Sequence, residues 1–100
     1  MDKIEAINKV KQYRLLLKDY FELEKVYLFG SYANNTYRED SDIDVAVVVK
    51  HIEGDFFTTN PMLWKLRRQI DDRIEPILIE QDNDLGGFLN EIQKYGIEIS

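Results

Sequence analysis

The stretch "FGSYANNTYREDSDID", from Phe29 to Asp44, separates two apolar runs and decides how the chain is interpreted. It is too long for a hairpin turn, which takes two to five residues, and it places Asp42 and Asp44 where the second run begins. Residues two apart in a strand point to the same face, so these carboxylates are expected side by side, about 6 to 7 Å apart along the strand. Such a pair repels and is costly to desolvate unless a cation lies between the two groups.

Gly30 and Ser31 open the same stretch and favour an anion. A glycine at the end of a strand lets a phosphate approach the backbone closely, and residues 31–35 are expected to form a helical turn whose free N–H groups attract negative charge. Oxygen-only ligands suit Mg2+ or Mn2+, which take one or two carboxylates together with phosphate oxygens. A pair of such ions activates an attacking oxygen and stabilises a leaving one. The pattern therefore indicates phosphoryl or nucleotidyl transfer.

Helices are predicted on both sides of this stretch. Apolar residues recur every three or four positions from Asp2 to about Glu22, which indicates an amphipathic helix whose stripe Tyr13, Leu17 and Tyr20 faces the core. A loop is expected at 51–61, followed by a second helix that Asn60 caps and Pro61 begins. A short helix is expected within 81–96, with Phe88, Leu89 and Ile92 directed inward.

Strands are predicted at 25–30, 43–49 and 73–80. Residues 97–100 are expected to form either a brief fourth strand or an irregular end. The near-continuous apolar run at 43–49 indicates burial on both faces. Pro76 places the third strand at an edge, because proline cannot donate to a ladder. The expected fold is therefore α+β, a small mixed sheet of three to four strands with helices packed on it, in one domain over residues 1–100.

Composition narrows the possible partners. Thirteen basic and nineteen acidic residues give a net charge of −6, the wrong sign for holding a long phosphate backbone, so a polynucleotide substrate is not expected. No segment has the apolar length of a membrane span and the first residues lack the apolar run of a signal peptide, so we expect no membrane association and a cytoplasmic location. The absence of cysteine excludes a disulfide framework and a thiolate metal site.

Glu75 is the expected third acidic group of the site. It lies between Ile74 and Pro76 in the third predicted strand, and its roles would be metal ligand and general base toward an incoming hydroxyl. The alternative is a solvated charge on an edge strand, since acidic residues are usually exposed. The remaining charged residues nearby are expected at the surface: Asp71, Asp72, Glu80, His51, Lys65, Arg67 and Arg68.

The residues at 30–31 and 42–44 carry a resemblance to a known family. Gly-Ser, ten residues and then Asp-Ile-Asp resembles the signature of the DNA polymerase β-like nucleotidyltransferase superfamily, and the small chain is similar to its minimal, single-domain (MNT) branch. The resemblance covers most of the chain and implies a polymerase β palm-like fold. It implies that NMP passes from an NTP to a hydroxyl, with two Mg2+ ions bound by three carboxylates, and the site residues that it assigns are Asp42, Asp44, Glu75, Gly30 and Ser31.

The sequence differs from the family pattern at residues 34–35, and the resemblance implies a partner protein. Many relatives have Arg-Gly where this chain has Asn34-Asn35, and Arg38 is a candidate replacement for the basic contact. Minimal nucleotidyltransferases often act beside a HEPN-domain protein, a toxin that they neutralise and can AMPylate, so ATP or another NTP and an antitoxin role are implied. The alternatives are a non-catalytic binding module of the same fold and a small-molecule nucleotidyltransferase. A homo-oligomer is compatible with the sequence.

Overall fold

A computed structural model describes residues 1–52, 54, 56–83 and 85–100 of the chain. The helices are α1 (Lys3–Leu17), α2 (Ser31–Asn34), α3 (Phe56–Leu66) and α4 (Phe88–Tyr95). The strands are β1 (Leu23–Phe29), β2 (Ile43–Val49), β3 (Ile74–Glu80) and β4 (Ile97–Ile99). Short 3₁₀ turns lie at Arg67–Gln69, Gln81–Asn83 and Leu85–Gly87. None of the helices in these ranges is long and apolar enough to cross a membrane.

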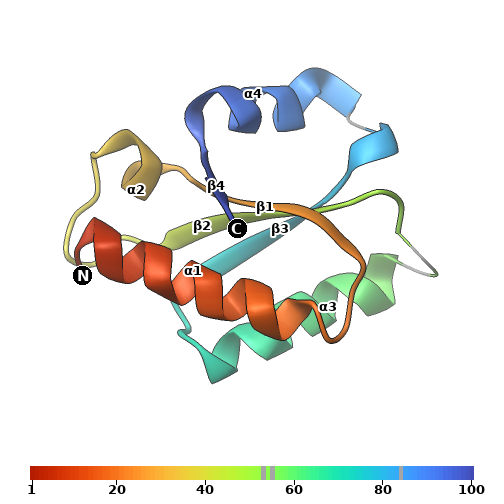
Figure 1. Ribbon diagram of the computed structural model, residues 1–100, viewed down its shortest axis with the longest axis horizontal. Helices are drawn as coiled ribbons and strands as arrows, with labels where there is room; N and C mark the ends of the chain where they lie inside the picture. The colour runs from red at the N-terminus through yellow and green to blue at the C-terminus, as the bar shows by residue number, and fades with distance from the viewer. Residues whose placement is uncertain (53, 55, 84) are drawn as a thin grey trace.

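The strands form one mixed sheet in the order β3-β2-β1-β4. β1 runs antiparallel to both β2 and β4, whereas β2 and β3 are parallel and are joined through α3. Figure 1 shows α1 and α3 on one side of this sheet and α4 on the other. The predicted α+β class with a small mixed sheet is confirmed, and Pro76 lies on the edge strand β3 as expected.

The two faces of the sheet bury separate cores. Alternate residues of a strand point to opposite faces, so Val45 and Val47 of β2 pack into the core beneath α1 and α3, while Ala46 and Val48 pack beneath α4. All four are buried. The apolar run at 43–49 therefore reflects burial on both faces, as the sequence indicated.

Three sequence-based predictions about the helices are wrong. α1 ends at Leu17, well before residue 22, and Tyr20 is 53% exposed in the turn that follows, so it is not part of the core stripe. Phe88 is 44% exposed because it is the first residue of α4, where only part of the helix covers the sheet. α3 begins at Phe56 and contains Pro61. An interior proline removes one helical hydrogen bond and crowds the carbonyl four residues earlier, and the buried Leu63 and Leu66 anchor the helix beyond it.

The loop predicted before α3 is shorter than expected for the same reason. Residues 56–60 belong to the predicted loop but are helical in the structure. Glu53 and Asp55, which also belong to the predicted loop, lie outside the described residues.

Candidate active site

The strand ends that carry the predicted site residues meet at one end of the sheet, on the left-hand side of Figure 1. Asp44 of β2 is paired with Phe29 of β1 on one side and with Glu75 of β3 on the other. Residues directly opposite one another on neighbouring strands project from the same face. Phe29, Asp44 and Glu75 therefore form a row across three strands, with Asp42 just before the first residue of β2.

Gly30 lies against the carboxylate of Asp44. Its φ of 72° and ψ of −146° belong to a region that is essentially restricted to glycine. A Cβ atom at this position would lie 2.1 Å from Oδ2 of Asp44. The absence of a side chain therefore allows the end of β1 to approach the carboxylate, which agrees with the close backbone approach expected from the sequence.

The predicted helical turn after Gly30 is present as α2. The N–H of Asn34 donates to the carbonyl of Gly30 at 3.0 Å, and Ser31 begins the turn. Asn35 ends it in the left-handed conformation with a φ of 61°, which asparagine adopts more readily than most residues. Asn35 thus adopts a backbone conformation that glycine also adopts readily, whereas the neutral amide of Asn34 does not replace the positive charge of an arginine.

The three carboxyl groups interact with one another. Burial raises the pKa of Asp44 above its ordinary value, and the negative charge of Asp42 adds to this effect. Burial also raises the pKa of Glu75, as do the charge of Asp42, a hydrogen bond with Asp42 and the charge of Asp44, while Arg67 opposes the shift. The structure therefore brings Asp42, Asp44 and Glu75 together, and Glu75 is half-buried and not a freely solvated charge.

The donor set suits a hard divalent cation. The two ion pairs found among the described residues, Lys9–Asp71 and Lys25–Glu98, do not involve the three carboxylates. In the same part of the chain, no group of three or more His, Cys, Asp or Glu side chains is arranged so that it could already hold a metal ion. Mg2+ commonly takes one or two carboxylates and completes its shell with water and phosphate oxygens, so carboxylates that repel one another fit such an ion together with a substrate.

Arg67 was expected in a solvated basic face and instead holds the beginning of β3. Its Nη1 donates to the carbonyl oxygens of Asp72 at 2.7 Å and Ile74 at 2.9 Å. The outer carbonyls of an edge strand have no neighbouring strand to supply donors, and the guanidinium group takes that place. Lys65 and Arg68 are exposed, as expected. Arg67 thus positions β3, the strand that carries Glu75. The run of basic residues in the sequence did not reveal this role.

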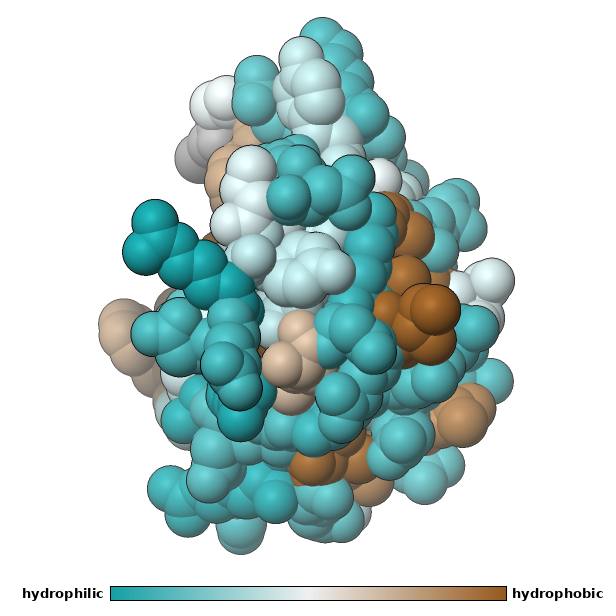
Figure 2. Space-filling model, turned by 90° about the vertical axis from the view of Figure 1, so that its left-hand side faces the viewer, coloured by the Kyte–Doolittle hydropathy of each residue, from teal (hydrophilic) through white to brown (hydrophobic). Residues whose placement is uncertain are grey.

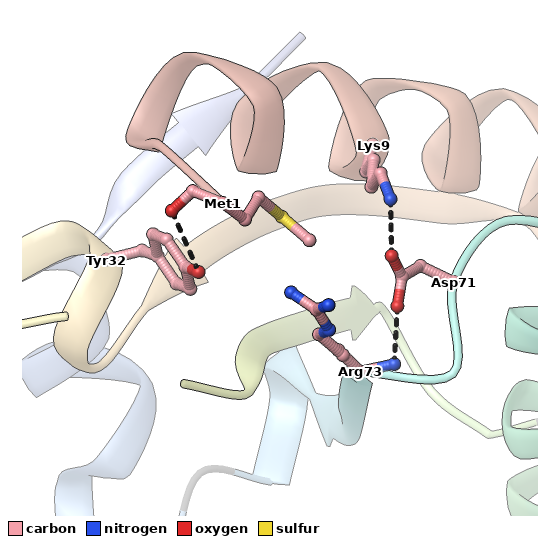
Figure 3. A network of polar contacts seen from close by, with 5 residues as sticks. All are labelled: Met1, Lys9, Tyr32, Asp71 and Arg73. Atoms are coloured by element: carbon pink, nitrogen blue, oxygen red, sulfur yellow. Dashed lines mark hydrogen bonds and ion pairs between the residues drawn. The ribbon is translucent and has the colours of Figure 1, made fainter. Parts of the chain in front are cut away.

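Asp71 was also expected at the surface and instead joins β3 to α1 (Figure 3). Its carboxylate accepts hydrogen bonds from Lys9 and from the backbone N–H of Arg73. Burial acts to raise the pKa of Asp71, but these two hydrogen bonds and the charges of Lys9 and Arg73 lower it below its ordinary value. In the same view, the hydroxyl of Tyr32 in α2 donates to the carbonyl of Met1 at 3.4 Å. These contacts tie α1 to both sides of the site.

The remaining candidates contribute less to the site. Arg38 is exposed, and its backbone N–H donates to Oγ of Ser41 at 2.7 Å, which stabilises the turn between α2 and β2. His51 is exposed beyond the far end of β2, as expected. Glu80 is half-buried and accepts the N–H of Ile52 at 3.2 Å, so the expectation of a free surface charge is wrong there. The carboxylate of Glu80 thus satisfies the N–H of Ile52, which lies beyond the end of β2.

The site opens on an end of the molecule that is largely hydrophilic. Figure 2 views the molecule from the left-hand side of Figure 1 and shows mostly hydrophilic colours, interrupted by a few separate apolar groups. One apolar neighbour of the site was missed at the level of the sequence, namely Phe29. In the sequence, the only indication that Phe29 lies near the site is its position directly before Gly30. Its proximity to Asp44 follows from the strand register.

Comparisons with known proteins agree with this arrangement. Residues 8–99 match the family described as polymerase beta, nucleotidyltransferase. A predicted protein adenylyltransferase of Methanocaldococcus jannaschii is 34% identical over 104 residues, which cover 99% of this chain and 100% of that protein. The crystal structure of a predicted nucleotidyltransferase from Sulfolobus solfataricus superimposes with a TM-score of 0.73 and 26% identity, covering 96% of this chain and 80% of that one.

Proposed function

The chain belongs to the polymerase β nucleotidyltransferase family and is a nucleotidyltransferase, and we propose that it transfers AMP from ATP to a hydroxyl group of a partner protein. The observation that carries this proposal is the row formed by Asp44 and Glu75, with Gly30 packed against Asp44. The similarity to a predicted protein adenylyltransferase supports a protein as the acceptor.

The site residues take the following roles in this proposal. Gly30 and Ser31 hold the phosphates, because their backbone lies beside the carboxylates and begins the turn α2. Asp42, Asp44 and Glu75 hold divalent metal ions, which the family generally uses, and we propose two Mg2+ ions. When bound, these ions neutralise charge on the phosphates and on the attacking oxygen.

The reaction is a substitution at the α-phosphorus of ATP. The acceptor oxygen forms a bond to this phosphorus while the bond from phosphorus to the bridging oxygen of pyrophosphate breaks, and pyrophosphate leaves with that electron pair. The hydroxyl proton passes to a carboxylate oxygen of Glu75, which acts as the general base. The products are an AMP ester of the protein and pyrophosphate.

We further propose that the acceptor is a HEPN-type toxin and that the chain acts as its antitoxin. The support is the resemblance to minimal nucleotidyltransferases in the residues Gly30, Ser31, Asp42 and Asp44. A second candidate, neutralisation by binding alone, is favoured by the exposed aromatic side chains of α3: Phe57 is 82% exposed and Trp64 is 36% exposed.

Incubation with ATP labelled at the α-phosphate, Mg2+ and the HEPN-type protein tests the two candidates. The expected result is labelled partner protein with the parent chain and no label with Asp42→Ala combined with Asp44→Ala. Asp19→Ala is the matched control, because Asp19 is an exposed carboxylate in the turn after α1, and it should label normally. A double variant that neutralises the toxin as well as the parent chain would reject the enzymatic account and favour the binding module.

A further inference from the structure

We propose that a groove between the end of β1, α2 and α4 binds the purine base of the nucleotide by stacking. This groove, called the base groove below, is lined by Phe29, Gly30, Asn34, Phe88, Glu91 and Tyr95, among other residues. The proposal rests on the proposed function, because it assigns a place to one part of the same substrate. It adds residues of α4 to a site that the sequence pattern confines to the segment 30–44 and Glu75.

The base groove is continuous with the proposed phosphate site. Gly30 and Asn34 line the groove and also form the first and last parts of the turn that includes α2. Phe29 also lines the groove and is paired directly with Asp44 across β1 and β2. A nucleotide whose phosphates lie at Gly30 can therefore place its base over Phe29 without crossing another element of the fold.

The size and the walls of the groove suit one flat ring system. Its volume is about 220 Å³, below the range of roughly 300–1,000 Å³ that drug-sized ligands occupy. Phe29 and Phe88 meet edge to face, with ring centroids 5.9 Å apart and an interplanar angle of 88°. Phe88 is 44% exposed and Tyr95 is 66% exposed. A stacked base would cover these rings, and every base has a face suited to this contact.

Polar groups lie at the rim of the same groove. Asn34 and Glu91 are both exposed and line it. An asparagine amide both donates and accepts hydrogen bonds, and a carboxylate accepts them. The N–H donors and ring nitrogen acceptors of a purine edge match these groups, so the groove offers stacking inside and hydrogen bonds at its margin.

Binding measurements separate the base from the phosphates. The ligands are an ATP analogue with a methylene group between the α- and β-phosphates, which cannot transfer AMP, and inorganic tripolyphosphate, each titrated into the full chain with Mg2+ by calorimetry. The parent chain should bind the analogue more tightly than tripolyphosphate. Phe88→Ala and Tyr95→Ala together should weaken analogue binding roughly 10- to 100-fold, the loss expected for a stacked base, and leave tripolyphosphate binding within about two-fold.

Two further variants control for folding and for aromatic loss in general. Phe88→Leu keeps an apolar side chain against Phe29 but removes the ring, so it should fold normally and still weaken analogue binding. Tyr20→Ala removes an aromatic residue that is 53% exposed in the turn after α1, away from the groove, and should leave both ligands unaffected.

The outcomes distinguish this proposal from the proposed function. A parent chain that binds neither ligand overturns both. Binding of both ligands by the parent, with unchanged analogue affinity in the Phe88 and Tyr95 variants, overturns the base groove alone. Equal loss of the two ligands also overturns it, because the residues would then support the site structurally. An effect confined to the apparent KM of the acceptor protein would assign the groove to the acceptor and overturn it as well.

Discussion

The two faces of the sheet differ in how completely they are covered. The face beneath α1 and α3 holds more than twice as many buried residues as the face beneath α4, among the residues that the structure describes. The row of Phe29, Asp44 and Glu75 lies on the α4 face, whereas Tyr32 of the turn α2 packs into the core beneath α1 and α3. One face therefore provides most of the stability, and the other leaves room for a substrate.

The difference arises from a short helix and from strand periodicity. Residues 44, 46 and 48 of β2 share the α4 face, and only Ala46 and Val48 are covered by the apolar residues Leu89 and Ile92 of α4. Asp44 continues the same row beyond the covered part. A helix of eight residues spans about 12 Å, so the end of the sheet remains open where the carboxylates lie.

The largest effect on stability is expected from Leu17→Ala in the α1/α3 core. Leu17 is completely buried at the end of α1, and truncation of a buried leucine typically costs ~2–5 kcal/mol through lost transfer free energy and a residual cavity. Urea unfolding monitored by circular dichroism measures the loss. Leu15→Ala, at a residue that is 60% exposed in the same helix, should change the free energy of unfolding by about 0.5 kcal/mol or less. Equal losses in the two variants would contradict the assignment of the core to this face.

Gly30→Ala should combine a moderate loss of stability with loss of activity. The φ of 72° at this residue strains any other side chain by about 1–3 kcal/mol, and the new methyl group would displace the carboxylate of Asp44. Thermal unfolding and adenylyl transfer should be measured together. Gly54→Ala is a control with a similar φ of 82° and no neighbouring atom within 4 Å, so it should carry the strain and leave transfer intact. Normal transfer by the Gly30 variant would contradict the proposed site.

Adjacent valines of β2 offer a direct comparison of the two faces. Val47→Ala removes two methyl groups from the larger core and should cost about 2–3 kcal/mol of unfolding free energy. Val48→Ala makes the same change beneath α4, where a single short helix can settle into the space, and should cost about 1 kcal/mol less. Both values come from urea unfolding under one set of conditions. A larger loss for the Val48 variant would reverse the comparison.

The smallest change in the free energy of unfolding is expected from Asp44→Asn, and this change is an increase in stability. Burial and the charge of Asp42 raise the pKa of Asp44 in the folded protein above its ordinary value of 3.8, so the folded state binds this proton more tightly than the unfolded state does. Stability from the protonated form is present below the unfolded pKa and is lost as the pH rises through the folded pKa. At neutral pH the asparagine variant should therefore be more stable than the parent chain and inactive in adenylyl transfer.

Unfolding of the parent chain and the Asp44→Asn variant as a function of pH tests the sign. The advantage of the variant should be present at pH 7 and should shrink as the pH falls through the raised pKa of Asp44, because the parent carboxyl group then becomes protonated. Asp19→Asn, at an exposed residue, should show no such advantage. A variant that is less stable than the parent at pH 7 would indicate that Asp44 makes a stabilising contact in the absence of substrate.

Much of the fold followed from local patterns in the chain. The apolar run 43–49 has the same bounds as β2, and the turn expected after Gly30 is α2. Capping chemistry was a weaker guide: Asn60 and Pro61 resembled a helix start and lie inside α3. Propensity describes one or two residues at a time, whereas the packing of Leu63 and Leu66 against the core decides how far the helix extends.

The sequence by itself determined the candidate residues of the proposed site, because Gly30, Ser31, Asp42 and Asp44 are a local pattern and their spacing is independent of the rest of the chain. The tertiary structure alone decided which distant residues join them. Strand register places Glu75 and Phe29 beside Asp44, Arg67 and Asp71 position the start of β3, and α4 provides the aromatic wall of the base groove. These neighbours are set by pairing and packing between segments far apart in the chain, for which no local pattern exists.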